Sequence, residues 1–253
     1  MVHFVGAGPG ATDLITVRGQ RLIAEADVII YAGSLVNPEL LKGAKPGCDC
    51  LDSASMTLEE VISRIEIAEA AGQTTVRLHT GDPSIYGAIR EQMDALDAKG
   101  IEYDVTPGVS SFCASAAAIP AEFTLPGQSQ TVIITRMAGR TPVPEKERMR
   151  TLAAHRASMA IFLSTGLLES LSQELIEGGY GPDDPAAIVY KASWPDERAF
   201  RCTVATRAET AAREGITKTA MILVGSFLGD QYERSLLYHP NFSHMDREAK
   251  DAD

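Results

Sequence analysis

Glycine-rich loops, rather than clusters of acids, histidines or cysteines, are the parts of this sequence best suited to chemistry. Residues 6–11 (GAGPGA) match the relaxed dinucleotide-binding pattern G-x-G-x-x-A, which requires a strand before it and a helix after it. The match is incomplete, because the second predicted strand runs into YAGS (31–34) without an acid and Pro9 removes one backbone donor. Three interpretations stay open: a nicotinamide site, a structural turn, and a loop that lets another flat or anionic ligand approach the backbone.

Three further loops, 31–37, 80–87 and 106–111, also follow predicted strands. Open α/β sheets bind ligands outside the carboxyl ends of their strands, so we expect these loops to carry a ligand site. The segment 81–87 (GDPSIYG) combines a turn, a short acid and an aromatic residue, and 107–111 (PGVSS) opens a helix with free N–H groups. Asp82 either contacts a ligand or has a structural role, as a turn former or as the cap of the helix.

Motifs of several other enzyme classes are absent from the sequence. It contains no G-x-S-x-G elbow, no phosphate-loop lysine, no H-E-x-x-H and no paired cysteine or histidine ligands. The five histidines show no ligand spacing, and His79, beside the 80–82 loop, is expected to be packed or hydrogen-bonded. We therefore expect no bound metal, and the catalytic residues are unknown at this stage.

Charge is unevenly distributed along the chain. The 34 acidic and 23 basic residues give a net charge of −11, which argues against nucleic acid or a membrane as partner. Between residues 131 and 157, however, six residues are basic and two are acidic. Arg136 and Arg140 directly follow a predicted strand, and guanidinium groups bind carboxylates in a forked geometry, so we expect these two to contact substrate carboxylates. The alternative is that the whole run is a solvated face.

Alternating strands and helices must position these loops. Apolar and β-branched runs predict strands at 2–5, 27–31, 74–78 and 103–105, and helices at 14–23, 57–71 and 85–98. A linker at 121–128 separates an N-terminal domain (1–120) from a C-terminal domain (129–253). The second domain has predicted strands at 131–135, 159–163, 187–190, 201–204 and 220–224, and helices at 167–177 and 205–214. This alternation predicts an α/β fold with a largely parallel sheet.

Size and composition are those of an ordinary globular protein. The chain has 253 residues, 45% of them apolar and 23% charged, which suits one or two domains with a substantial core. No apolar run approaches the roughly 18 residues of a membrane-spanning helix, and the amino-terminal residues have no signal-peptide pattern. The four cysteines are scattered, so we expect reduced thiols and a cytoplasmic location.

Taken together and in this order, GAGPG (6–10), YAGSLV (31–36), TGDP (80–83) and PGVSS (107–111) resemble the tetrapyrrole (corrin/porphyrin) methyltransferases. The resemblance implies two α/β domains in tandem with a ligand cleft between them, and a homodimer. It also implies S-adenosyl-L-methionine as cofactor, S-adenosyl-L-homocysteine as product and a tetrapyrrole as substrate. Within the family, AGSLV (32–36) and LYHPNF (237–242) are most similar to members that methylate C11 of precorrin-4, or of cobalt-precorrin-4, in cobalamin biosynthesis.

The resemblance also assigns site residues. The implied cofactor-binding residues are Pro9, Thr80, Gly81, Asp82, Ile85, Ser110, Ser111, Leu163, Ala192, Thr219 and Ala220. The expected substrate-binding residues are Gly8, Gly10, Ser34, Tyr86, Arg136 and Arg140. Family members that act on uroporphyrinogen carry an aspartate, regarded as the proton acceptor, where this chain has Ala32, and a lysine where it has only SAS (53–55). Both departures argue against that substrate and leave the proton acceptor unassigned.

Three alternatives to C11 methylation stay open. The nearest is methylation of a different carbon of a corrin precursor. A second is a nicotinamide-dependent reductase that uses the same first glycine loop. The third is a non-enzymatic module that carries or senses a tetrapyrrole, against which the intact set of four loop motifs argues.

Overall fold

The computed structural model describes residues 1–236, 241–243, 245 and 247–248. Contacts divide the chain into two compact units. Unit 1 comprises residues 1–115 together with 191–197, a segment that the sequence groups with the second domain, and unit 2 comprises 116–190 and the described residues from 198 onward. The predicted domain limits at 120 and 129 stay predictions. No helix in the described part of the chain is long and apolar enough to cross a membrane.

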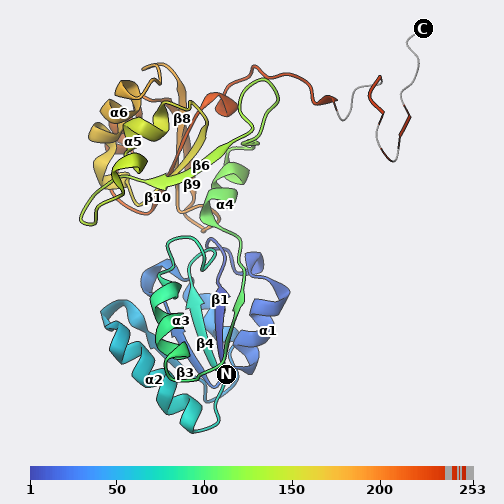
Figure 1. Ribbon diagram of the computed structural model, residues 1–253, viewed down its shortest axis with the longest axis vertical. Coiled ribbons are helices and arrows are strands. Elements are labelled where there is room, and N and C mark those ends of the chain that lie inside the picture. Colours follow the sequence, from blue (N-terminus) through green and yellow to red (C-terminus); the bar gives the residue numbers. More distant parts are fainter. Residues whose placement is uncertain (237–240, 244, 246, 249–253) are drawn as a thin grey trace. The chain divides into compact units, whose positions relative to one another are not determined.

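Unit 1 is built on a five-stranded parallel sheet with the strand order β3-β2-β4-β1-β5 (Figure 1). Its strands are β1 (Val2–Gly6), β2 (Val28–Tyr31), β3 (Asp49–Asp52), β4 (Thr75–His79) and β5 (Tyr103–Thr106). Every residue of β4 is buried, because this strand pairs with β1 and β2 inside the sheet. The predicted parallel arrangement is confirmed for this unit. β3 is not among the strands that the sequence predicts, because its four residues are mostly exposed.

Helices cover both faces of this sheet. α1 (Val17–Glu25) packs its Leu22 and Ile23 against one face, with Val5 and Leu78. α2 (Leu58–Ala70) and α3 (Ile89–Asp97) cover the other face, around Phe4. Figure 1 shows α1 on one side of the strands and α2 and α3 on the other. Because helices cover both faces of the sheet, unit 1 is a three-layer α/β arrangement. α4 (Ser111–Ala118) follows β5 in the chain.

The helix starts show how local sequence sets the elements. The predicted capping box of α2 is confirmed: Glu60 N donates to Thr57 Oγ1 (3.3 Å), and Thr57 N donates to the Glu60 carboxylate (2.7 Å). The sequence predicts that this helix begins at residue 85, but α3 begins at Ile89. The reason is that Tyr86 and Ala88 adopt left-handed backbone conformations, with φ of 56° and 49°. The residues before α3 are thus a strained loop rather than a first helical turn.

Unit 2 contains a second five-stranded sheet, with the order β6-β7-β10-β8-β9. Its strands are β6 (Val132–Arg136), β7 (Ser158–Phe162), β8 (Pro185–Tyr190), β9 (Arg198–Thr203) and β10 (Ala220–Val224). Of its four strand pairs, β6–β7 is parallel and the other three are antiparallel. A largely parallel sheet is therefore a wrong expectation for this unit. No helix connects β8 to β9, and β10 inserts between β7 and β8 in the opposite direction to both.

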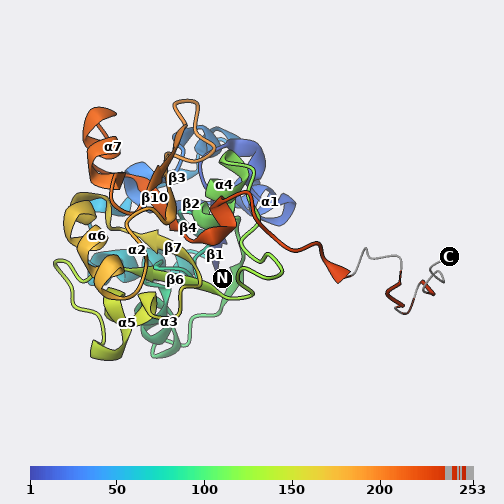
Figure 2. The same cartoon turned by 90° about the horizontal axis from the view of Figure 1, so that it is seen from above.

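Helices α5 (Met149–Ala153), α6 (Leu168–Glu177) and α7 (Arg207–Arg213) complete unit 2. α5 and α6 pack against each other (Figures 1 and 2), and Leu171 of α6 reaches a core that includes Met159 and Ile222 of the sheet. Short 3-10 helices occur at Thr12–Leu14, Gly33–Leu35, Pro38–Gly43, Ser53–Ser55, Glu145–Glu147, Thr165–Leu167 and Ser226–Leu228. Two α/β units follow one another along the chain, as the predicted fold class requires.

Candidate functional site

The loops after β1 and β4 leave the first sheet at the point where its crossover connections diverge. β1 and β4 are neighbouring parallel strands, yet α1, which follows β1, covers one face and α3, which follows β4, covers the other. At such a point an open α/β sheet leaves a crevice at the carboxyl ends of its strands, where ligands bind. Gly8 and Gly81 join the two loops here through reciprocal main-chain hydrogen bonds of 3.2 and 2.8 Å. The predicted ligand loops 6–11 and 80–87 therefore meet at one edge.

Three glycines bring the loops after β1, β4 and β5 into backbone contact. A Cβ atom on Gly6 would lie 2.6 Å from both Gly108 Cα and Gly81 O, and a Cβ on Gly108 would lie 2.1 Å from Gly81 O. Side chains at either position are thus excluded by main-chain atoms. Ser110 and Ser111 follow in the third loop, with Ser110 Cα and Ser111 N 3.5 Å from a Cβ placed on Gly81. Seven of the predicted cofactor residues lie in these three loops (6–11, 80–87 and 106–111): Pro9, Thr80, Gly81, Asp82, Ile85, Ser110 and Ser111.

Asp82 links the second loop to the third. One carboxylate oxygen, Oδ1, accepts hydrogen bonds from the Ser84 N–H (2.9 Å) and the Ser84 hydroxyl, and the other, Oδ2, accepts one from Gly108 N (2.8 Å). Partial burial raises the pKa of Asp82, but the hydrogen bonds from Ser84 and Gly108 outweigh it and leave the pKa below its ordinary value. Asp82 thus forms the turn through Oδ1 and links the two loops through Oδ2, and it does not cap α3, whose N-cap residue is Ala88.

The first glycine loop is held from two directions by other parts of unit 1. Asn37 Nδ2 donates to the Gly10 carbonyl (2.8 Å), and Trp194 Nε1 donates to the Pro9 carbonyl (2.9 Å). Gly8, Pro9 and Gly10 are all buried. Gly8 has a φ of 77°, and a Cβ there would lie 2.9 Å from Leu14 O, while a Cβ on Gly10 would meet the Trp194 ring. Protein contacts account for both glycines, and their assignment to substrate stays a prediction.

The loop between β4 and α3 is tightly folded and displays an aromatic side chain. A Cβ on Gly87 would lie 2.2 Å from Pro83 O, and Gly87 stands between the two left-handed residues Tyr86 and Ala88. Such non-glycine conformations cost on the order of 1 kcal/mol or more each and gather at ligand sites. Tyr86 is 47% exposed and Ile85 is half-buried, so the loop offers an apolar and aromatic edge to a ligand. Ser34, in the loop after β2, is likewise exposed.

His79 and Thr80, at the end of β4, carry buried polar atoms that are not hydrogen-bonded. His79 Nε2 and Thr80 Oγ1 have no partner within the described part of the chain. Burial, followed by the nearby charge of Arg77, lowers the pKa of His79 to about 3, so its imidazole is neutral at physiological pH. A buried hydroxyl without a partner costs about 1–3 kcal/mol, which a ligand atom at Thr80 would recover. Thr80 is thus the predicted contact with a specific unmet hydrogen-bonding need.

The predicted residues of unit 2 also include strained positions. Leu163 follows β7 with a φ of 53°, and Thr219 precedes β10 with a φ of 58°. Leu163 is 69% exposed although it is apolar, whereas Ala220 is buried and its carbonyl accepts a hydrogen bond from Thr165 Oγ1 (3.1 Å). Left-handed leucine and threonine are uncommon, which makes these two positions candidates for ligand contact. Ala192, by contrast, is buried in the unit 1 segment 191–197.

Arg136 uses its guanidinium group within its own loop. Nη1 donates to the carbonyls of Met137 and Thr141 (both 3.1 Å), and Nη2 donates to that of Pro142 (2.8 Å). The side chain therefore folds the loop after β6 around itself. Arg140 is exposed in that loop. Contact of either arginine with substrate stays a prediction, and Arg140 has the more accessible side chain.

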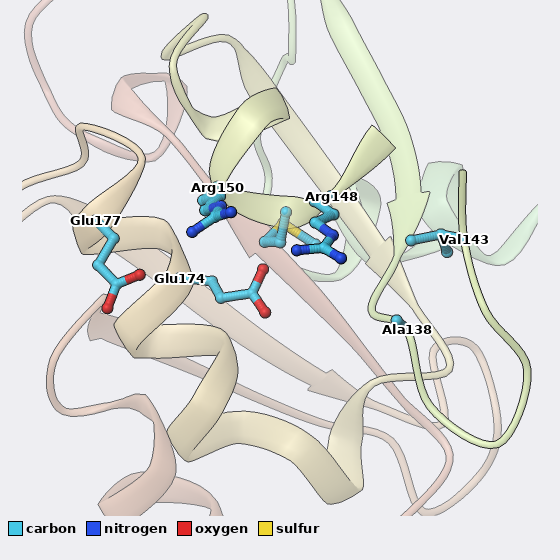
Figure 3. A pocket seen from close by; sticks show the side chains of 7 residues that line it. Ala138, Val143, Arg148, Arg150, Glu174 and Glu177 are labelled. Carbon is cyan, nitrogen blue, oxygen red and sulfur yellow. The ribbon is translucent and has the colours of Figure 1, made fainter. Parts of the chain in front are cut away.

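Two further arginines of the basic run at 131–157 form ion pairs within unit 2. Arg148 pairs with Glu145 (2.6 Å), and Arg156 pairs with Asp184 (2.9 Å). Figure 3 shows Glu174 of α6 pointing toward the space beneath Arg148 and Arg150, in a pocket of about 260 Å³. The pocket is lined by Ala138, Val143, Arg148, Met149, Arg150, Glu174 and Glu177. Charges of both signs face this pocket and it contains none of the predicted site residues, so it does not favour an anionic ligand.

Known proteins are similar to this chain in both sequence and fold. The family described as tetrapyrrole (corrin/porphyrin) methylases matches residues 1–208. The chain belongs to this family. A cobalt-precorrin-4 C(11)-methyltransferase from Methanocaldococcus jannaschii is 53% identical to this tetrapyrrole methylase, over 98% of this chain and 96% of the relative. The resemblance deduced from the four loop motifs is confirmed.

Solved structures of tetrapyrrole methylases have the same architecture. The X-ray structure of a cobalamin biosynthetic enzyme, cobalt precorrin-4 methyltransferase, superimposes with a TM-score of 0.89 at 46% identity, covering 90% of this chain and 96% of that one. Uroporphyrin-III C-methyl transferase from Thermus thermophilus, complexed with S-adenosyl homocysteine, gives 0.72 at 27% identity, covering 90% and 92%. The predicted α/β fold class is thereby confirmed. The motif LYHPNF (237–242) is one of the two that indicate the C11-methylating members, and its residues 237–240 lie outside the described part of the chain.

Several residues that hold the candidate site of this tetrapyrrole methylase together cannot be identified from the sequence alone. Asn37, Ser193 and Trp194 hold the first glycine loop, and of these only Asn37 lies in a loop that the sequence identifies, 31–37. Asn37 has one local signal, because its side chain also caps the 3-10 helix at 38–43. Trp194 has only its rarity as the single tryptophan of the chain. No group of three or more potential metal ligands occurs within the described ranges.

Proposed function

We propose that this tetrapyrrole methylase transfers a methyl group from S-adenosyl-L-methionine to C11 of precorrin-4, or of its cobalt form, in cobalamin biosynthesis. The observation that carries the proposal is 53% identity over almost the whole length of a cobalt-precorrin-4 C(11)-methyltransferase. The contact of three glycine loops at the switch point of the first sheet supports it, because that edge is where such sheets bind nucleotide-like ligands.

The residues at this edge fit S-adenosylmethionine. The cofactor presents an amino acid group and an adenosine, which need hydrogen-bonding atoms and a close approach to the backbone. Thr80 Oγ1 is buried without a partner, and the glycines of the three loops carry no side chain that would keep a ligand away from the backbone. Pro9, Gly81, Asp82, Ser110 and Ser111 would hold the cofactor in unit 1, with Ile85 at its apolar part, and Leu163, Ala192, Thr219 and Ala220 complete the proposed set.

The sparse set of polar side chains agrees with methyl transfer. When bound, S-adenosylmethionine supplies an electrophilic methyl group on a sulfonium. The chain then has to bind and orient two reactants, which in favourable cases lowers a barrier by about 7–11 kcal/mol. A rigid junction of backbone loops, braced by Asp82, meets that requirement without a protein nucleophile. Neutral His79 adds no charge beside this junction.

Methyl-labelled S-adenosylmethionine and precorrin-4, with and without cobalt, test the activity. We expect one label per product molecule, located at C11 by carbon NMR. Label at another corrin carbon would establish the neighbouring alternative, and absence of label would overturn the proposal. Calorimetric titration with S-adenosylhomocysteine and NADH separates the reductase, for which NADH alone would bind. A homodimer in the cytoplasm completes the proposal, and light scattering of the purified protein tests the dimer.

Arg140 and Arg136 provide a paired test of carboxylate recognition. We expect Arg140→Ala to raise KM for the tetrapyrrole about tenfold and to leave the melting temperature unchanged, because one charge-assisted contact is lost. Arg136→Ala should lower the free energy of unfolding by about 1–3 kcal/mol, because the carbonyls at 137, 141 and 142 lose their donor. Arg213→Ala, which removes only an exposed pair with Glu214, is the control. An unchanged KM in Arg140→Ala would return the basic run to a solvated face.

A further inference from the structure

Residues 191–197, here called the strap, fold as a compact turn in unit 1. Trp194 N donates to Lys191 O and Glu197 N donates to Trp194 O, both at 3.0 Å, and Ser193 N donates to the Glu197 carboxylate. Lys191 and Ser193 have φ values of 47° and 68°, a left-handed conformation that residues other than glycine rarely adopt. Contacts outside the turn must therefore stabilise this conformation.

Those contacts are made with the first glycine loop, residue by residue. Trp194 Nε1 donates to the Pro9 carbonyl (2.9 Å), and Ser193 Oγ accepts a hydrogen bond from Ala11 N (3.0 Å). Between them, the indole ring fills the place of a Gly10 side chain, since a Cβ there would lie 2.1 Å from Cδ1 and 2.2 Å from Nε1 of Trp194. Three consecutive loop residues are thus engaged by two consecutive strap residues.

The contact explains why residue 10 is glycine. Gly8 adopts a left-handed conformation, so its backbone alone demands glycine, but the φ of Gly10 lies outside that region. An alanine at position 10 is therefore excluded by the indole and not by the backbone. Gly10 and Trp194 form a matched pair, although they are separated by more than 180 residues of sequence.

We propose that Trp194 is a positioning residue for cofactor binding: the seated strap fixes the Pro9 carbonyl and the Ala11 N–H, and so sets the main-chain edge that S-adenosylmethionine meets. The proposal rests on the proposed function, because Pro9 is assigned to the cofactor there. Trp194 itself is only partly buried, and the Lys191 ammonium lies 5.6 Å from its ring centroid while pairing with Asp196 (2.7 Å). One part of the indole ring therefore contacts the loop. Another part is accessible, so we expect ligand binding to change the surroundings of the ring.

Binding of S-adenosylhomocysteine to strap variants tests the proposal directly. We expect Trp194→Ala to weaken binding in calorimetry by about tenfold or more, because the Pro9 carbonyl loses its donor and the loop its packing. KM for S-adenosylmethionine should rise by a similar factor, with kcat changed less than about threefold, since a binding surface and not the transition state is affected. Trp194→Phe, which keeps a ring and removes the N–H, should fall between. Fluorescence of the single tryptophan should change with the same Kd as the calorimetric titration.

A double-variant comparison isolates the pair. Gly10→Ala should weaken binding in the wild-type background, whereas Gly10→Ala combined with Trp194→Ala should bind no worse than Trp194→Ala alone. Gly43→Ala, where a new Cβ meets only Ile23 at 3.9 Å, is the control for adding a methyl group to unit 1. Circular dichroism establishes that each variant is folded, and Trp194→Phe serves if Trp194→Ala is not.

The outcomes separate this inference from the proposed function. If the wild type fails to bind S-adenosylhomocysteine, the proposed function is wrong. If it binds, but Trp194→Ala and Trp194→Phe bind within about twofold of wild type, the positioning role is overturned. The positioning role would also be overturned if Gly10→Ala weakened S-adenosylhomocysteine binding equally in the wild-type and Trp194→Ala backgrounds. The same holds if tryptophan fluorescence did not change when the ligand binds.

Discussion

Replacing Gly108 by alanine is expected to abolish cofactor binding and to destabilise unit 1 by about 3 kcal/mol or more, as overpacking against fixed atoms does. The new Cβ would lie 2.1 Å from Gly81 O and 2.8 Å from Gly6 Cα. Both are main-chain atoms, so no side chain can rotate away to make room. The loops after β1, β4 and β5 would have to separate, and these loops carry the proposed cofactor contacts.

Urea denaturation and calorimetric titration with S-adenosylhomocysteine measure the two effects. Gly43→Ala, with its nearest contact at 3.9 Å, is the matched control and should unfold like the wild type. Gly81→Ala should be milder than Gly108→Ala, because its Cβ would meet Ser110 at 3.5 Å and the cost is mainly the left-handed φ of 61°. Equal stability of Gly108→Ala and Gly43→Ala would contradict the close approach of the three loops.

The first sheet could largely be predicted from sequence because its strands are short apolar runs that end in glycine and proline. Parallel strands bring their carboxyl ends to one edge, so the sequence predicts that the loops at 6–11, 80–87 and 106–111 lie at one site. β3 could not be predicted in this way, since Asp49–Asp52 is polar and mostly exposed. The second sheet differed because strand direction depends on which strand β10 joins, and no local pattern encodes that choice.

Within the site, sequence identifies the glycines but not the reason for each. Only the structure separates Gly8, required by its own φ, from Gly108, required by the Gly81 carbonyl, and from Gly10, required by the Trp194 ring. The last two depend on contacts between distant segments, for which a single sequence has no periodic signal. Arg136 shows a different limit: its charge suggests a ligand contact, but no pattern in the sequence indicates that its guanidinium donates to the carbonyls at 137, 141 and 142.

Asp82→Asn should weaken S-adenosylhomocysteine binding by about tenfold or more and lower the free energy of unfolding by about 1.5–3 kcal/mol, the range for hydrogen bonds to a charged group. An asparagine oxygen can still accept the bonds from Ser84, but the amide nitrogen then faces the Gly108 N–H, a donor against a donor. Ser84→Ala, which removes one hydroxyl donor and keeps the bond to Gly108, is the matched control and should cost less than about 1 kcal/mol.

The pH dependence of this difference has a definite sign. Hydrogen bonds from Ser84 and Gly108 outweigh the effect of partial burial and hold the pKa of Asp82 below its ordinary value, so the folded state favours the ionised form. Its contribution to stability is therefore complete above the unfolded-state pKa of about 4 and is lost as pH falls through the lower folded-state pKa. Urea denaturation of wild type and Asp82→Asn at a series of pH values should show a constant gap near neutrality that narrows in acid. A gap that widened as pH fell below about 4 would mean that Asp82 is folded in its neutral form and does not join the loops as a carboxylate.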